Sequence, residues 1–316
     1  MARVDFKVKQ TIPQHLRYTM TTFNEEFPDD SACLAHIAEE RFPGGIAKCD
    51  KCGVDRKHYR VRGRTAYACD HCGNHIYPLA GTIFEKSTTS LRLWFYAMYL
   101  MGSTRCGISA KQIQREIGVT YKTAWRMFKQ IRTLMSEDLQ LEGPAVEMDE
   151  MYYGGVRKHG TGRPMRGDKK KTPVVGIVER KGRAVAKVAE GVDSKTLLGM
   201  VREHILPESM VYTDELTSYG GIEALRDRKN IEKSAGYRHR RINHSSKVYV
   251  VGDIHTNSVE GFWSLIKRGI GGVYHSVSQK YLQSYLDEYS FRYNRRDQGN
   301  LIFKSILEQV SERASD

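Results

Sequence analysis

Two cysteine pairs of the form C-x-x-C-G, in the segments Cys49–Gly53 and Cys69–Gly73, constrain the fold of this sequence more than any other feature. Each motif can form a tight turn whose two thiolates point to the same side, and the sixteen residues between the pairs leave room for hairpin strands. Two such turns on successive hairpins complete a closed, tetrahedral site of four sulfur ligands. We therefore predict a zinc ribbon that binds a structural Zn²⁺ through Cys49, Cys52, Cys69 and Cys72.

A redox-active dithiol or a chance repeat would also account for the cysteine pairs, and His58, His71 or His75 could replace one sulfur ligand. The first ten residues, MARVDFKVKQ, contain no apolar segment of the kind that directs export. Close cysteine pairs in such a chain favour metal binding in a reducing compartment over disulfides. We therefore expect a cytoplasmic protein.

The charge of the chain indicates the class of its partner. Lys and Arg total 50 against 37 Asp and Glu, which gives a formal net charge of +13. An excess of this kind attracts phosphates, so nucleic acid is the first partner to test, although a basic protein can also bind none. No apolar run approaches the roughly 20 residues that cross a bilayer, and we expect no membrane partner.

Composition separates three regions of the 316 residues, and the cysteine pairs divide the first of them again. We expect an N-terminal helical segment (1–45), a zinc ribbon (46–85), a helical DNA-binding region (86–142) and an α/β region (143–316).

The helical region contains a candidate helix-turn-helix motif. Residues Ile108–Ile117 and Tyr121–Met135 have helical patterns, and Gly118–Thr120 forms a short turn between them. In that motif the N-terminal residues of the second helix enter the major groove. An ordinary helical hairpin without a role in DNA binding would show the same short pattern. The residues predicted to face DNA are Tyr121, Lys122, Thr123 and Arg126, with Lys129 at the phosphate backbone.

The α/β region begins with three strands, a helix and a fourth strand. These elements are expected at Ala145–Tyr153, Pro173–Glu179, Ala184–Ala189, Lys195–Ile205 and Met210–Thr213. This order is the start of an RNase H-like fold, in which the fourth strand lies beside the first.

Three acids occupy the positions that carry catalysis in such a fold. Asp149 is midway along the first strand, Asp214 follows the fourth, and Glu260 lies on a later helix at 256–268. Strand alternation places Glu147 on the face of Asp149 and Glu150 on the other, which leaves Asp149 or Glu147 as the first acid.

Converging carboxylates suit the cleavage of a phosphodiester. Two Mg²⁺ ions roughly 3.5–4 Å apart can activate a water and stabilise the leaving oxygen, and carboxylate oxygens are the ligands these ions prefer. Lys267, two turns after Glu260, would neutralise a phosphate. Each acid alone has a simpler explanation, as a helix cap or a solvated charge.

The sequence resembles insertion-sequence transposases of the ISXO-type clade, which are related to the eukaryotic Merlin elements. The resemblance rests on Glu147–Gly155, Tyr212–Asp214 and His255–Gly269, and continues through Gly272–His275, Tyr285–Tyr289 and Phe291–Arg296. With the cysteine pairs it extends from about Phe27 to Ile306.

The resemblance implies a DDE transposase that binds the terminal inverted repeats of a mobile element and catalyses DNA cleavage and strand transfer. It carries the first two acids to Asp149 and Asp214 and a lysine to Lys267, with Mg²⁺ or Mn²⁺ as cofactor. Glu260 is the preferred third ligand, and Asn257 or His255 are alternatives. It also implies a homo-oligomer on double-stranded DNA in the nucleoid. A DNA-binding regulator with an inactive RNase H-like domain, or a nuclease without a joining step, are the competing hypotheses.

Three basic segments fit a DNA-binding protein. Residues 157–171 form a glycine-rich basic segment that either clamps DNA or is a solvated loop. Tyr237–Arg241 and Arg292–Arg296 combine aromatics with cations, which suits phosphates and base stacking, although the second could pack a C-terminal helix.

Overall fold

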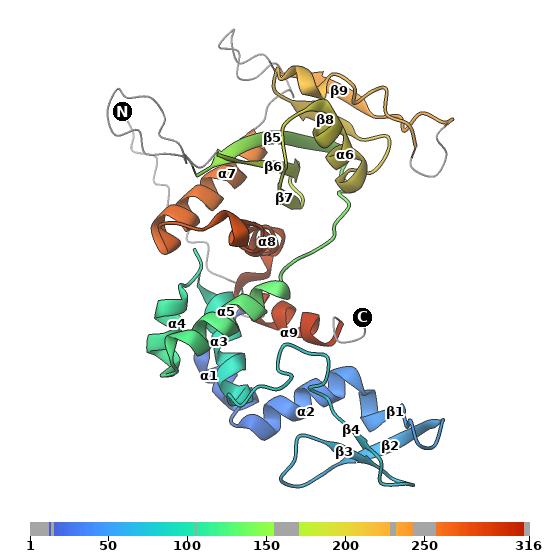
Figure 1. Cartoon of the computed structure of the whole chain (residues 1–316), viewed down its shortest axis with the longest axis vertical. Coiled ribbons are helices and arrows are strands. Elements are labelled where there is room, and N and C mark those ends of the chain that lie inside the picture. Colours follow the sequence, from blue (N-terminus) through green and yellow to red (C-terminus); the bar gives the residue numbers. More distant parts are fainter. Residues whose placement is uncertain are drawn as a thin grey trace. The chain divides into compact units, whose positions relative to one another are not determined.

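The computed structural model describes residues 13, 16–104, 106–154, 171–227, 232–242 and 257–312. Contacts divide the chain into two compact units, one made of Met1–Leu134 with Arg295–Asp316 and the other of Met135–Asn294 (Figure 1). In the described part of the chain, no helix combines the length and the apolar character that crossing a bilayer requires. Segment 157–170 and the alternative ligand His255 lie outside the described residues.

Four helices of the first unit pack around an aromatic core. They are α1 (Met20–Glu26), α2 (Asp30–Arg41), α3 (Leu91–Ser103) and α9 (Ile302–Glu312). The rings of Phe23, Phe27 and Phe303 contact one another with centroids 5.7–6.0 Å apart, and all three side chains are buried. Asp29 caps the start of helix α2, where its side chain accepts the N–H of Ala32 at 2.8 Å.

The predicted ribbon is a four-stranded antiparallel sheet. Its strands are β1 (Ile46–Lys48), β2 (Asp55–Arg60), β3 (Tyr67–Cys69) and β4 (His75–Ile76), and they neighbour one another in chain order.

Two short helices, α4 (Ala110–Ile117) and α5 (Tyr121–Thr133), lie where the sequence predicts them. The Ser109 and Thr120 side chains cap their N-termini. Gly118 ends α4 with φ 71°, a left-handed conformation that glycine adopts without strain. The turn between the two helices is therefore specified locally.

The second unit contains a five-stranded mixed sheet in the order β7-β6-β5-β8-β9. Its strands are β5 (Ala145–Tyr153), β6 (Thr172–Glu179), β7 (Ala184–Val188), β8 (Met210–Thr213) and β9 (Arg238–Arg241). The first three are antiparallel, whereas β8 pairs parallel with β5, which confirms the predicted neighbour, and β9 pairs parallel with β8. Strand β9 was not predicted, because its sequence RHRR is polar and largely exposed.

Helices cover both faces of this sheet. Helix α6 (Ser194–His204) packs on one face in a core that includes Val146 and Met148. Helices α7 (Asn257–Gly269) and α8 (Gln279–Asn294) pack on the other in a core that includes Met151. Strand β5 therefore alternates between two apolar cores, and a polar residue along it has a defined face.

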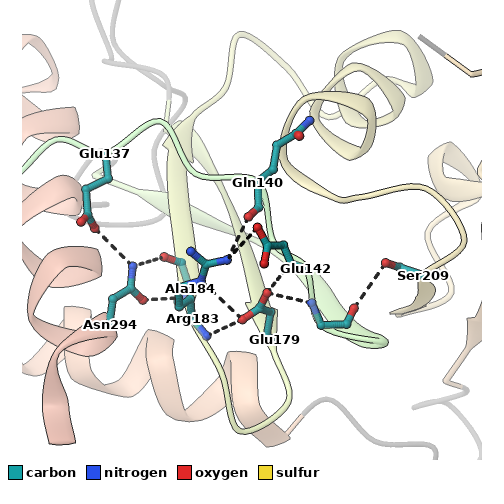
Figure 2. Close-up of polar contacts among 9 residues, drawn as sticks. Glu137, Gln140, Glu142, Glu179, Arg183, Ala184, Ser209 and Asn294 are labelled. Carbon is teal, nitrogen blue, oxygen red and sulfur yellow. Dashed lines mark hydrogen bonds and ion pairs between the residues drawn. The ribbon is translucent and has the colours of Figure 1, made fainter. Parts of the chain in front are cut away.

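A buried carboxylate ties the segment before β5 to the β6–β7 turn (Figure 2). Glu179 accepts the backbone N–H groups of Glu142, Gly143 and Arg183 at 2.5–2.9 Å. Nearby, the side-chain amide of Asn294 accepts the backbone N–H of Ala184 in β7 and donates to the carbonyl of the same residue. These bonds hold the entry to β5 in place.

The C-terminal segment belongs to the first unit by its contacts. Helix α9 packs on α2 and α3, and a Cβ added to Gly102 of α3 would lie 2.8 Å from the backbone nitrogen of Phe303. The predicted boundaries at 45, 85 and 142 stay predictions, and the contact units divide the chain differently, at Leu134 and Arg295.

Candidate metal centres

Among the described residues, two groups of side chains have potential ligand atoms within 4.8 Å of one another, and the first is formed by Cys49, Cys52, Cys69 and Cys72. The Sγ atoms of Cys49 and Cys72 are 3.4 Å apart, and those of Cys52 and Cys69 are 3.9 Å apart.

Both cysteine turns have the same backbone conformation and hydrogen bond. Gly53 and Gly73 donate to the carbonyls of Cys49 and Cys69 at 2.8 and 3.1 Å, with φ values of 74° and 72°. A side chain would be strained at both glycines. His58 is buried, and its Nδ1 lies 3.0 Å from the Arg56 carbonyl, away from the thiol group.

Two of the four thiols, Cys49 and Cys52, have pKa values shifted in opposite directions. Burial opposes ionisation of Cys49, but hydrogen bonds from the Cys52 backbone and the Cys72 thiol lower its pKa to about 6. The hydrogen bond with Cys72 and burial raise the pKa of Cys52 to about 12. The Cys49 thiol therefore ionises more readily than that of Cys52, and a divalent cation with affinity for sulfur would displace the remaining protons of the group as it binds.

The second group joins Asp149, Glu150 and Asp214, again with carboxylate oxygens within 4.8 Å of one another. The parallel pairing of β5 with β8 explains how they meet. Glu147 is opposite Tyr212, so Asp149 and Asp214 lie two residues further along adjacent strands.

Asp149 is held by the helix that carries Glu260. The indole Nε1 of Trp263 donates to its Oδ2 at 2.8 Å. Burial raises the pKa of Asp149; the Trp263 bond opposes this, and the charges of Asp214 and Glu260 add to it. Carboxylates crowded in this way favour a cation between them.

Glu150 was not predicted as a site residue. It lies on the opposite face of β5, as alternation predicts, and its Oε2 accepts the hydroxyl of Tyr219 at 2.7 Å. Burial raises its pKa, the Tyr219 bond lowers it, and Asp214 and Asp149 raise it further. Strand alternation alone did not predict this position. The Glu150 side chain leaves β5 on the face opposite Asp149, yet its carboxylate lies within 4.8 Å of that of Asp214.

The choice between Glu147 and Asp149 follows from hydrogen bonding. The Glu147 carboxylate is fully buried and accepts from the backbone N–H groups of Ser258 and Val259 and from Arg180, at 2.8–3.1 Å. Its oxygens are occupied by the start of α7, so Asp149 is the better candidate for a metal ligand.

The remaining predicted catalytic residues lie on α7. Glu260, Asn257 and Lys267 are exposed, and Glu260 is outside the group within 4.8 Å although its charge acts on Asp149. Their roles stay predictions.

The predicted DNA-facing residues of α5 are on its surface. Tyr121, Lys122, Arg126 and Lys129 are exposed, and Thr123 is half-buried beside the cap Thr120. Contact of these residues with DNA stays a prediction.

The two aromatic–basic segments differ. Arg238, Arg240 and Arg241 are exposed on β9, but Tyr237 is buried and donates to the Ile205 carbonyl at 2.8 Å, so its ring is unavailable for base stacking. In the second segment Arg292 is buried against Glu288 at 2.8 Å. Residues 292–294 are the end of helix α8 itself, so Arg292 takes part in packing, as the alternative interpretation expects for this segment, and DNA contacts of Arg295 and Arg296 stay a prediction.

Comparisons with known proteins match both parts of the chain that carry these groups to transposase domains. The model of the ISXO2-like transposase domain matches residues 140–294, and that of the transposase zinc-ribbon domain matches residues 28–75. A protein in transposable element ISH50 from Halobacterium salinarum is 28% identical over 292 residues, covering 86% of this chain and 94% of its own length. A transposase-like protein from Haemophilus influenzae is 30% identical over 123 residues, covering 39% and 89%.

Among solved structures, a chain of a pre-cleavage Mos1 transpososome aligns with 67% of this chain and 73% of its own. The identity is 12% and the TM-score is 0.28, values too low to establish a common fold.

Proposed function

Because the chain belongs to the ISXO2-like transposases, we propose that it binds the ends of a mobile DNA element and cleaves and joins DNA strands with divalent metal ions. The observation that carries this proposal is the meeting of Asp149 and Asp214, which lie far apart in sequence, on adjacent parallel strands. The sheet order, with three antiparallel strands followed by two parallel ones, supports an RNase H-like domain.

The donor sets fit two different ions. Four thiols suit Zn²⁺ in a structural site. Asp149, Asp214 and one further acid suit Mg²⁺ or Mn²⁺, which would stabilise the attacking and leaving oxygens of a phosphodiester. Glu150 and Glu260 are both candidates for that further acid. Glu150 is closer to the pair, and Glu260 lies on the helix that Asp149 contacts.

The basic charge of the chain supports DNA as the partner. We assign recognition of the element's ends to the zinc ribbon and to a helix-turn-helix formed by α4 and α5, with Lys122, Arg126 and Lys129 toward DNA. Action on two ends at once would require an oligomer on DNA.

Cleavage and joining can be tested separately with the full-length protein. Wild type should nick a duplex carrying an element end in Mg²⁺, and join pre-cut ends to a plasmid. Asp149→Ala and Asp214→Ala should each lower both rates about 1,000-fold or more, because metal ions supply several kcal/mol of transition-state stabilisation. Glu190→Ala, which removes an exposed acid outside the group, is the matched control.

Each alternative has its own outcome. Wild type that binds end DNA but never cuts would be a regulator, and wild type that cuts without joining would be a nuclease. Glu150→Gln and Glu260→Gln, compared in the same assay, identify the third acid as the one whose loss matches that of Asp149.

A further inference from the structure

Glu147 makes contacts that the proposed reaction does not require of it. It lies on β5 two residues before Asp149, on the same face, with a side chain that is fully buried. Its partners Ser258 and Val259 are more than a hundred residues away, at the first turn of α7. A buried carboxylate without such partners would be strongly unfavourable.

The contacts amount to a helix cap supplied by the sheet. One carboxylate oxygen accepts the N–H groups of Ser258 and Val259 at 2.8 and 3.1 Å, and the other is bonded by the Ser258 hydroxyl at 3.2 Å. The positive end of the helix favours a negative charge at this place. Arg180 adds an ion pair at 2.9 Å and stacks on the ring of Tyr212, which fixes the carboxylate from the sheet side.

A second contact fixes the same helix further along. The Trp263 indole donates to Asp149, and its ring lies against Gly176, the residue paired with Asp149 across β5 and β6. A Cβ at Gly176 would be 2.5 Å from Cζ2 of the indole, so only glycine leaves room for this approach. Glu147 and Asp149, on one face of β5, thus hold α7 at its first turn and at Trp263.

Glu260 lies between the two held points. Residues 258 and 259 are fixed by Glu147, and residue 263 is fixed by Asp149, so the turn that carries Glu260 has little freedom to move. The Trp263 bond also engages one oxygen of Asp149 and sets the orientation of the other. Groups that orient metal ligands in this way influence metal affinity strongly.

We propose that Glu147 and Trp263 are positioning residues of the metal centre. Glu147 fixes the first turn of α7, and Trp263 fixes the carboxylate of Asp149, so Asp149 and the turn that carries Glu260 are both held in place before a metal ion binds. This inference rests on the proposed function, because it assigns Asp149 to a metal site.

The competing explanation is that both contacts only stabilise the fold. Glu179 provides a matched control, because it is also a buried carboxylate of this sheet that accepts several backbone N–H groups. Its described bonds go to the turn and to the segment before β5, not to α7. Glu147→Gln and Glu179→Gln therefore each neutralise a buried carboxylate that accepts several backbone N–H groups, one at the start of α7 and one away from it.

The experiment measures Mn²⁺ binding to the full-length, zinc-loaded protein by electron paramagnetic resonance, together with thermal unfolding. Glu147→Gln should weaken Mn²⁺ binding about ten-fold or more, in the range seen when groups supporting metal ligands are removed. Glu179→Gln should lower the unfolding temperature and keep wild-type Mn²⁺ affinity. Equal weakening in both variants, or none in Glu147→Gln, would overturn the proposal.

A second replacement tests Trp263 without disturbing packing. Site-specific incorporation of 3-benzothienylalanine at position 263 keeps the ring size and replaces only the N–H by sulfur. Mn²⁺ affinity should fall about ten-fold with little change in unfolding temperature. If this variant kept the Mn²⁺ affinity of wild type, Trp263 would not be a positioning residue.

The outcomes separate this inference from the proposed function. If wild type binds Mn²⁺ through Asp149, shown by loss of binding in Asp149→Asn, but never cuts DNA, the proposed function fails and the positioning roles are still measured. If wild type cuts DNA and the variants at 147 and 263 keep its Mn²⁺ affinity, only the positioning roles fail. Wild type without Mn²⁺ affinity overturns both.

Discussion

The cysteine group and the acid group are both sets of ligand atoms within 4.8 Å, yet the chain builds them in opposite ways. The cysteines come from two turns of one small sheet, each turn specified by its own C-x-x-C-G sequence. The acids come from strands β5 and β8, which are separated in sequence by two strands and a helix. One site is determined by local sequence and the other by the pairing of distant strands.

The two sites also depend differently on their surroundings. Strands β1 to β4 are short and bury few apolar side chains besides Cys49 and Cys69. A sheet of this size needs a metal to be stable. The acid group lies at a sheet with apolar cores on both faces, so its framework should fold without a metal. This contrast leads to three predictions.

The largest expected effect is that of zinc removal. Chelation, or the double substitution Cys49→Ser and Cys72→Ser, should unfold residues 46–76, because structural zinc sites contribute about 10–16 kcal/mol of binding free energy to folding. Hydrogen exchange should show loss of protection in β1 to β4 and unchanged protection in β5 to β8. Asp149→Asn with Asp214→Asn should leave both regions protected. If β1 to β4 stayed protected from hydrogen exchange without zinc, the ribbon would not depend on a metal ion for its fold.

An intermediate effect is expected at Gly176. Gly176→Ala places a methyl group against the Trp263 ring, with distances of 2.5 and 2.7 Å to Cζ2 and Cη2. Overpacking of this kind should reduce the free energy of unfolding by about 1–3 kcal/mol, measured by denaturant unfolding. Gly261→Ala, on the exposed side of α7 with no atom within 4 Å of the new Cβ, should instead add about 0.5–1 kcal/mol. If both substitutions changed the free energy of unfolding alike, the Trp263 ring would not lie against Gly176 as described.

The smallest effect is expected from the charge of Asp149. Burial, with Asp214 and Glu260, raises the pKa of this carboxyl above its ordinary value of 3.8, so the folded protein holds the proton to higher pH than the unfolded chain. The contribution to stability is complete below pH 3.8 and is lost as the pH rises through the raised pKa.

Asn cannot ionise and should avoid that loss. In zinc-loaded protein without Mg²⁺ or Mn²⁺, Asp149→Asn should match wild type at pH 3.8 and unfold at a higher temperature at pH 7. Added Mg²⁺ should stabilise only wild type. An Asp149→Asn variant that is less stable than wild type at pH 7 would show that the carboxylate is not disfavoured in the fold.

Local signals predicted much of the structure. Ser109, Thr120 and Gly118 mark the ends of α4 and α5, because caps and left-handed turns act over one or two residues. The apolar pattern predicted the strands from β5 to β8, and alternation predicted the two faces of β5. It did not predict β9, whose backbone pairing with β8 does not depend on apolar side chains.

Contacts between distant segments were less predictable. Helix α9 packs with α2 and α3 rather than with the sheet, a choice that depends on how its apolar face fits, as at Gly102. The sequence also left Glu147 and Asp149 as alternatives for the first acid. Their different hydrogen-bond partners on α7 now distinguish them.

By itself, the sequence determined the cysteine turns, the starts of the helices and the face on which each acid of β5 lies, because these follow from covalent geometry and short-range periodicity. Only the tertiary structure decided which acids share a site. The approach of α7 to β5 occupies Glu147 and orients Asp149, and the path of β8 brings Asp214 beside Glu150. Those outcomes depend on the packing of whole elements, and no short stretch of sequence encodes them.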